Sequence, residues 1–367
     1  MKTSSGFSFL GTFGLTLLAI AGLFTVDTFL AAVDRKESYA DADRDYRQAQ
    51  DLIAKGQDAK AIDHIKDALE IERDNKVYLR TLGQAQLELG RTTNAEKTAA
   101  NLLEADPADG QASLMMARTL QKEGRSLDAI SYYHRAVYGR WDQNQEANRR
   151  AARFELIDLL ARQNSNEDLL AELLAVQASP QDMKVRLQMG ELFLQAGSPE
   201  RAADIFHSIL HTDPKSAAAT RGIGETEFAR GNYRSAQRYF EYALRLAPDD
   251  PTTNERLETT NQLLHLDPTM RGLTTDERYQ RSLKLVDLTL SEVKNCTTQT
   301  SSPDMQNLLD KANAALTAKV TAAKQSEVAE SDLDIAEQLW QARKKEECKT
   351  PADANRPLAL VLARLTQ

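Results

Sequence analysis

A spacing of about 34 residues recurs through the middle of the chain and constrains its fold more than any other feature. Three residue types follow it independently, glycines first: Gly56, Gly90, Gly124, Gly197 and Gly231. Alanines lie five places after each glycine: Ala61, Ala95, Ala129, Ala202 and Ala236. Prolines close the units: Pro107, Pro180, Pro214 and Pro248. The interval from Gly124 to Gly197 exceeds two periods, so one unit is longer, and the poorly matching stretch 141–164 holds the extra residues. A period of about 34 residues predicts a stack of similar units.

Each mark suits a helical hairpin. A glycine in the middle of the unit fits a left-handed residue that ends the first helix. A proline at the end cannot continue the second helix. Small residues recur where the two helices would cross: Gly83, Ala117, Gly190 and Gly224. Large residues recur in the slot that would fill the space against the next hairpin: Ile65, Tyr133, Phe206 and Phe240. With 27% charged and only 6% aromatic residues, the composition is also typical of a long helical protein.

This pattern resembles the tetratricopeptide repeat, and the unit from Ala217 to Asp250 matches it at nearly every place. The register predicts repeats at about 42–75, 76–109, 110–143, 144–182, 183–216 and 217–250, with a capping helix from Thr252 to Leu264. The first repeat departs at its end, where Arg73 replaces proline, and the fourth is degenerate around Asp168. The resemblance implies an all-α right-handed superhelix of about six hairpins over 42–265, followed by a helical region at 266–367.

The N-terminal segment, 1–33, differs from the rest. Phe7 to Val26 contains no charged residue, which is enough for about 30 Å of helix. An uncleaved transmembrane anchor at 1–33, followed by a juxtamembrane segment at 34–41, is the preferred interpretation. A cleaved signal peptide and a buried soluble helix are the alternatives, but the best cleavage site has the bulky Leu30 where a small residue is wanted.

The orientation of this anchor is open. Arg35, Lys36, Arg44 and Arg47 follow the apolar run, and by the positive-inside rule they favour a cytoplasmic body. The short lysine-bearing start favours export, as in bacterial envelope proteins. The preferred prediction is a single-pass protein of a bacterial inner membrane with a periplasmic body; the alternative is a body facing the cytoplasm.

The 34-residue period is absent from residues 266–367, but sequence signals for helices are still present there. Thr274 and Glu277 form a capping box that opens one helix, Ser302-Pro303 opens a second that is predicted to reach about Lys324, and a third is expected from about Glu327 to Lys345. A last segment ends in LALVLARL. These segments predict either a small antiparallel bundle or a continuation of the array without its marks.

Cys296 and Cys348 are the only cysteines. Helices running up, down and up would place both at one end of the bundle, so a disulfide is predicted there, with two free thiols as the alternative. The loop closure would contribute roughly 4 kcal/mol, and a bridge would favour an oxidising compartment.

No catalytic, cofactor or metal motif emerges. His207 and His211 are spaced by one helical turn, but no third ligand lies near them in the sequence. Gly222 and Gly224 follow no strand, so they form no phosphate loop. A net charge of −8 argues against general nucleic-acid binding. The sequence therefore predicts no enzyme, no cofactor, no metal site and no nucleic-acid partner.

The resemblance implies a concave groove, lined by the first helix of each repeat, that binds proteins or peptides. By register the groove positions of repeats two to four form a basic, donor-rich strip: Arg80, Gln84, Arg118, Gln121, Lys122, Arg150 and Arg153. The strip suggests a partner with an acidic segment; ordinary solvated surface charge is the alternative. A clamp for a C-terminal carboxylate would want Lys and Asn where this chain has Tyr46 and Gln50.

The function predicted from these features is a membrane-anchored scaffold or assembly factor of the bacterial envelope. The alternative is an anchored receptor or co-chaperone-like adaptor that faces the cytoplasm.

Overall fold

The computed structural model describes residues 5–177, 182–296, 303–345 and 356–365, without the side chains of residues 5–23, 177, 296, 303, 344 and 356. All regular elements in these ranges are helices, so the predicted all-α fold is confirmed. The chain divides into two compact units, called here the N-terminal unit (Met1–Glu172) and the C-terminal unit (Leu173–Gln367).

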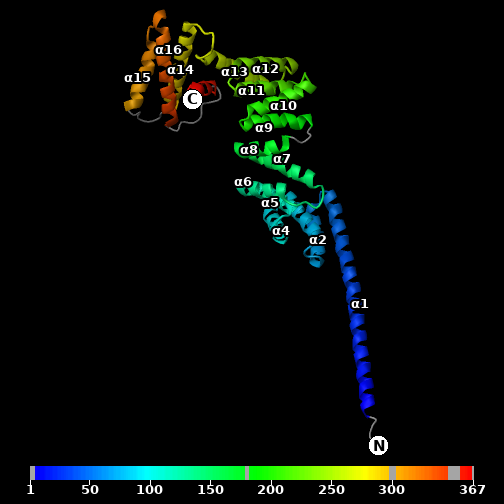
Figure 1. Ribbon diagram of the computed structural model, residues 1–367. Helices are drawn as coiled ribbons and strands as arrows, with labels where there is room; N and C mark the ends of the chain where they lie inside the picture. The colour runs from blue at the N-terminus through cyan, green and yellow to red at the C-terminus, as the bar shows by residue number, and fades with distance from the viewer. Residues whose placement is uncertain (1–4, 178–181, 297–302, 346–355, 366–367) are drawn as a thin grey trace. The chain divides into compact units, whose positions relative to one another are not determined.

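The N-terminal unit consists of helical hairpins (Figure 1). α1 (Ser5–Ala54) pairs with α2 (Asp58–Ile71), α3 (Lys76–Glu88) with α4 (Thr92–Ala105), and α5 (Gly110–Lys122) with α6 (Ser126–Tyr138). α7 (Gln145–Gln163) has 19 residues against 13 in α3 and α5, and α8 (Asn166–Gln177) follows it. The extra residues predicted between 141 and 164 thus lengthen the first helix of the fourth hairpin.

The C-terminal unit contains two further hairpins, α9 (Met183–Gln195) with α10 (Pro199–Thr212) and α11 (Ala217–Ala229) with α12 (Tyr233–Leu246). The expected capping helix is α13 (Pro251–Leu266). Four α-helices follow among the described residues: α14 (Thr275–Cys296), α15 (Pro303–Thr317), α16 (Gln325–Lys345) and α17 (Arg356–Leu365), with a 3-10 turn, η1 (Ala322–Lys324), before α16.

The turn glycines adopt the predicted left-handed conformation. Their φ angles range from 69° at Gly56 to 77° at Gly124. In the degenerate fourth hairpin Asn164 takes the same place, with φ of 55°. Asparagine is the residue other than glycine that most readily adopts this conformation. The repeat geometry therefore persists where the sequence mark is lost.

The small and large residues of the repeat pack as the period predicts. Ala95, Ala129, Ala202 and Ala236 have no exposed surface. Phe206 is 1% exposed, and a Cβ atom built on Gly190 would lie 2.6 Å from its ring. A Cβ on Gly224 would likewise lie 2.6 Å from the ring of Phe240. The helices can approach closely only because these positions lack a side chain.

The helices after the array confirm the predicted capping box and correct one helix end. Glu277 accepts a hydrogen bond from the Thr274 backbone nitrogen at 2.8 Å, and its own nitrogen donates to Thr274 Oγ1 at 3.2 Å. The helix expected to reach Lys324 ends at Thr317 instead. Thr317, Val320 and Thr321 are β-branched residues of low helix propensity, which is consistent with a break there.

α14 and α16 run in the same direction, as the up, down and up order predicts. Gln325 bonds Asp276 at 2.8 Å near the start of both helices, and Arg343 lies 3.5 Å from Glu292 near their ends. The predicted bridge between Cys296 and Cys348 falls outside the described residues. Tyr233 of α12 and Leu263 of α13 share one hydrophobic core with α14 to α17. The last repeat and the C-terminal helices are therefore packed as one body.

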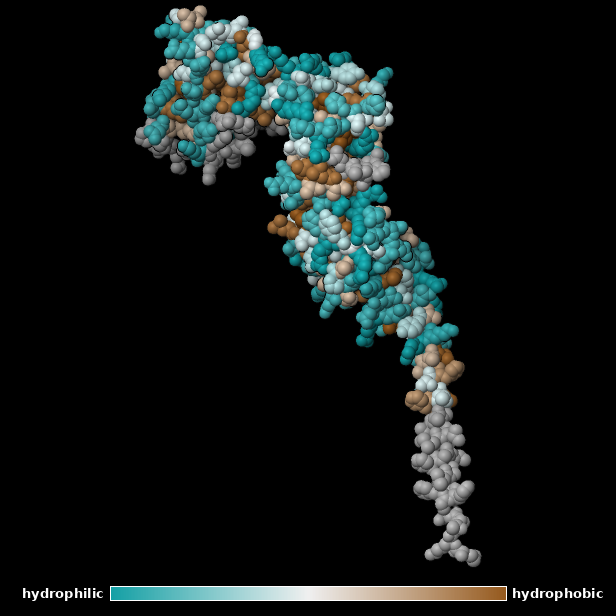
Figure 2. Space-filling view, in the orientation of Figure 1, coloured by the Kyte–Doolittle hydropathy of each residue, from teal (hydrophilic) through white to brown (hydrophobic). Residues whose placement is uncertain are grey.

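Within the described residues, no helix combines the length and the apolarity needed to cross a membrane. Most of the Phe7–Val26 run lies where side chains are not described. Residues 24–33 of α1, which hold the end of this run and continue it, are mostly apolar and exposed (Figure 2). Phe24 is 69% exposed and Phe29 67%, which is unusual for side chains of this size.

Candidate partner-binding groove

Two adjoining hollows lie on the first helices of the second to fourth hairpins, within the N-terminal unit. One measures about 550 Å³ and is lined mainly by α3, α5 and the segment before α7. The other measures about 620 Å³ and continues the first past Gln84, Glu88 and Arg118. We call the two together the α3/α5 groove. It lies where the repeat register places a concave binding face.

The floor of the groove is apolar and its rim is polar. Ala85, Leu114 and Met115 form the floor and are 3%, 7% and 4% exposed, whereas Val77 at one edge is 53% exposed. Amide side chains supply much of the rim: Gln84, Gln111, Gln121 and Asn148. An amide both donates and accepts hydrogen bonds, so it can pair with the backbone of an extended chain.

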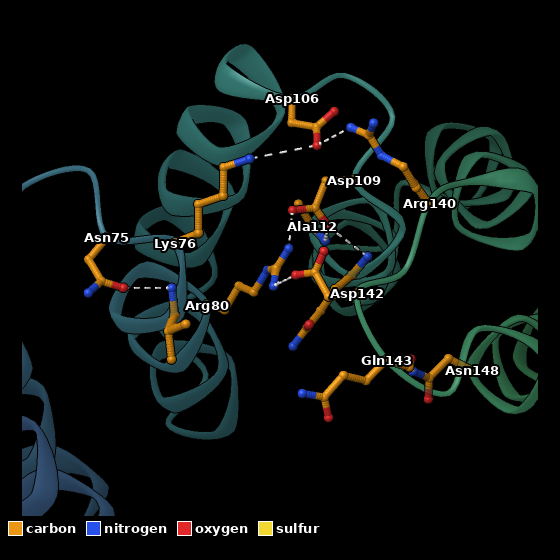
Figure 3. Close-up of polar contacts among 12 residues, drawn as sticks. Asn75, Lys76, Arg80, Asp106, Asp109, Ala112, Arg140, Asp142, Gln143 and Asn148 are labelled. Atoms are coloured by element: carbon orange, nitrogen blue, oxygen red, sulfur yellow. Dashed lines mark hydrogen bonds and ion pairs between the residues drawn. The ribbon is translucent and has the colours of Figure 1, made fainter.

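Arg80 joins three segments at one end of the groove (Figure 3). Its guanidinium lies 2.7 Å from Asp109 and 2.5 Å from Asp142. Asp109 also caps α5, because its other oxygen accepts from the backbone nitrogens of Gln111 and Ala112 at 2.9 and 3.0 Å. The hydrogen bond and charge of Arg80 hold the pKa of Asp142 below its usual value. Arg80 is thus a structural tie between hairpins as well as a groove residue.

A second ion pair, outside the Arg80 network, orders the same connection. Arg140 Nη2 lies 2.7 Å from Asp106 Oδ2, and Lys76 Nζ lies 3.7 Å from the same oxygen (Figure 3). The hydrogen bond from Arg140 lowers the pKa of Asp106. The backbones of Asp109 and Arg140 also pair as an isolated β-bridge. These contacts fix the loop that carries Trp141 into the groove.

Arg118 is paired in the middle of the groove. Its guanidinium donates to both oxygens of Glu155, from Nε at 2.9 Å and from Nη2 at 2.6 Å. Tyr133 donates to Gln121 at 2.7 Å, and its hydroxyl lies 3.2 Å from Glu155. Burial, with a smaller contribution from Glu155, raises the pKa of the Tyr133 hydroxyl. A bidentate pair of this kind fixes both side chains.

The other predicted strip residues differ in their surroundings. Gln84 donates to Glu88 at 2.6 Å, and Lys122 donates one hydrogen bond to the Leu87 carbonyl at 2.7 Å. Arg153 lies 2.9 Å from the buried Glu172, and Arg150 is exposed. Five of the seven predicted residues therefore line the groove, whereas Arg150 and Arg153 line neither hollow.

Sequence reasoning missed Trp141, Met115 and Glu155. Trp141 packs over Gly110 and donates to the Ala136 carbonyl at 2.9 Å. Trp141 and Glu155 lie in the stretch 141–164, which the repeat period does not cover. The insertion itself was the available signal, because residues inserted into a repeat map to loops on one face.

A match to a protein-family model agrees with the helical hairpins seen in the structure. The tetratricopeptide repeat model matches residues 80–144 and 187–251. The chain therefore contains tetratricopeptide repeats, and the first helices of stacked repeats form a concave surface.

Two similar proteins align with part of this chain. It is 27% identical over 145 residues to a DnaJ homolog subfamily C member 3 homolog of Dictyostelium discoideum, covering 39% of this chain and 29% of that protein. It is 24% identical over 217 residues to the human protein O-mannosyl-transferase TMTC1, covering 57% of this chain and 23% of that protein. The chain thus spans under a third of either relative's length.

Among solved structures, the chain is similar to YrrB, described as a TPR protein with an unusual peptide-binding site. The identity is 17%, the coverage 53% of this chain and 97% of YrrB, and the TM-score 0.44.

Proposed function

We propose that the protein is a scaffold that binds an extended segment of a partner protein in the α3/α5 groove. One observation carries the proposal: a continuous hollow with a buried apolar floor and an amide-bearing rim crosses three successive hairpins. The floor offers places for alternate apolar side chains, and the amides offer partners for the backbone between them. We propose binding, not catalysis, as the activity of this surface.

Whether the partner segment is acidic depends on which cationic side chains near the groove are available to contact it. Arg80 and Arg118 are engaged with acids of the chain itself, and Arg153 lies beside Glu172. Lys122 keeps further donors and Arg150 is exposed, so an acidic segment is the second candidate. An acidic partner should bind more weakly as salt rises, because screening shortens the Debye length from about 10 Å at 0.1 M to about 3 Å at 1 M. A largely uncharged segment should bind with little salt dependence.

The binding proposal is tested by blocking the groove without disturbing its core. Gln84 and Gln111 are exposed on α3 and α5, so Gln84→Arg with Gln111→Arg should fill the rim and leave the fold intact. Ala100→Arg with Ser131→Arg is the matched control, on exposed sites of the second helices α4 and α6. Partners recovered with the full-length chain should be lost in the groove variant and kept in the control. Equal recovery with both variants would reject the groove.

We propose further that the N-terminal segment anchors the protein in a bacterial inner membrane with the body in the periplasm. Support comes from the uncharged run Phe7–Val26 and from the exposed apolar side chains that continue it on α1. A membrane would cover such a surface. The full-length protein should stay in the membrane fraction after alkaline extraction, and a periplasmic reporter fused after Gln367 should be active. Activity of a cytoplasmic reporter instead would favour the adaptor with a cytoplasm-facing body.

A further inference from the structure

A histidine and two aspartates meet on the first helical hairpin, and none of them lines the α3/α5 groove. Asp45 lies on α1, and His64 and Asp67 lie on α2. His64 and Asp67 are three places apart, so they share one face of their helix. His64 Nδ1 lies 3.1 Å from Asp45 Oδ1, and one ligand atom from each of the three residues lies within 4.8 Å of the others.

We propose that Asp45, His64 and Asp67 bind a divalent transition-metal ion of the zinc class and thereby link α1 to α2. One imidazole nitrogen and two carboxylate oxygens are ligands that zinc accepts, at about 2.0–2.2 Å. Two atoms bound to the same ion at these lengths lie at most about 4.2 Å apart, and about 3.4 Å in a tetrahedron. The Asp45 and His64 atoms already satisfy this limit. Asp67 is exposed and its ligand oxygen lies within 4.8 Å of the other two atoms, so a rotation of its side chain would bring it within this limit.

The local charges also favour a cation. Two carboxylates offset the charge of a divalent ion, whereas without the ion their charges face one another. The arginines beside Asp45 on α1 are paired elsewhere, Arg44 with Asp41 and Arg47 with Asp43. Across the described ranges, neither Asp45 nor Asp67 forms a salt bridge with a lysine or arginine. The side chains of His64 and Asp45 are 28% and 33% exposed, so an ion can enter from solvent.

Three protein ligands leave a coordination position open, whereas structural zinc sites usually have four. Water or a group from a partner would occupy the open position. The ion would bind the folded hairpin and not the separated helices, so it would stabilise the first repeat by mass action. The first repeat also ends at Arg73, without the proline that closes the second, fourth, fifth and sixth repeats.

Calorimetric titration of the full-length protein in detergent with zinc chloride tests the proposal. We expect about one ion bound per chain by the wild type, and at least about tenfold weaker binding by His64→Gln and by Asp67→Asn. His207→Gln with His211→Gln is the matched control, because two exposed histidines one turn apart on α10 could bind zinc by themselves. This control should keep the wild-type site. Cobalt, which is coloured when bound, should give an absorption band that His64→Gln loses.

Zinc affinity unchanged in both His64→Gln and Asp67→Asn would overturn the proposal. Binding that disappears only in the His207 and His211 variant would overturn it as well, as would no binding by the wild type at millimolar zinc. Circular dichroism of each variant shows whether its helices remain folded. If His64→Gln loosened the hairpin, the exposed Asp67→Asn would decide the question alone.

Discussion

The hairpins α9–α12 and the helices α14–α17 belong to the same compact unit but are packed by different means. In the hairpins, a large ring fills a space left by glycines: Phe206 lies against Gly190 and Gly222, and Phe240 against Gly224. Those contacts join neighbouring helices and recur with the period. The C-terminal helices share a hydrophobic core and also bury ionisable groups, Asp332 at 1% and Arg343 at 6% exposure. They also join distant parts of the chain, since Arg364 of α17 reaches Asp267 at the end of α13 at 2.5 Å.

The packing of a repeat array can be predicted from its sequence, whereas the packing of a bundle of unlike helices cannot. A repeated contact leaves a repeated residue type, which one sequence can reveal. A contact between Asp267 and Arg364 occurs once and leaves no pattern.

Removing a repeat ring should have the largest effect. Phe206→Ala deletes a side chain that is 1% exposed and leaves a cavity beside Gly190 and Gly222. We expect a loss of about 3–5 kcal/mol in the free energy of unfolding. Urea unfolding followed by circular dichroism measures it. Tyr242→Ala, on a side chain that is 40% exposed, should cost under about 1 kcal/mol; similar losses would contradict the assigned packing.

Breaking the long-range contact should come next. Arg364→Ala leaves Asp267, whose side chain is 1% exposed, without its charged partner. A fully buried pair broken in this way loses about 3–5 kcal/mol; Arg364 is 36% exposed, so we expect about 2–3 kcal/mol. Hydrogen exchange at α13 and α17 should rise. Lys284→Ala removes the exposed pair with Asp287 and should change little, and an equal effect would show that α17 is not held by Arg364.

Adding volume at a helix crossing should cost somewhat less. Ala236 has no exposed surface, so Ala236→Leu should overpack α11 against α12 and cost about 1–3 kcal/mol. Glu241→Leu places the same side chain on the exposed face of α12 and serves as the control. Gln237 is a poorer control, because it bonds Asn261 at 2.7 Å. Thermal unfolding that shifts equally in both variants would contradict the register.

The smallest effect concerns a buried carboxyl group in the bundle. Desolvation raises the pKa of Asp332 on α16 from 3.8 to about 6, and Tyr279 of α14 is the titratable group that faces it. Between these values the folded state keeps a proton that the unfolded state has released, so stability falls as pH rises from about 4 to 6. Above about pH 6, Asp332 is charged in both states, and the folded state carries the full cost of burying that charge.

Asp332→Asn should remove this pH dependence. We expect the variant to be more stable than the wild type by about 1–2 kcal/mol above pH 7 and by little near pH 4. Hydrogen exchange at α14 and α16, measured across this range, is the readout. Exposed Asp334→Asn on the same helix is the control and should follow the wild type. A gain at pH 4 as large as that at pH 7 would contradict the burial of a charged group.

The sequence predicted the repeats well because their marks are steric requirements. The left-handed turn glycines, the buried alanines and the place of the longer unit all follow from the period. The break after Thr317 was missed because no glycine or proline marks it. The groove position could be predicted from the register, but most of the ion pairs that its arginines form could not. Two of their partners, Asp142 and Glu155, lie in the insertion, outside any repeated pattern, whereas Asp109, the other partner of Arg80, lies at the end of a repeat.

Site-specific photo-crosslinking tests most directly whether the α3/α5 groove binds a partner segment. A photoreactive amino acid is placed in the full-length protein at Gln84 or Gln111 on the groove rim, and at Ala100 or Ser131 on the second helices. We expect crosslinked adducts from the two groove positions and none from the other two. Adducts from Ala100 and Ser131 alone would exclude the groove and place the binding surface on the second helices.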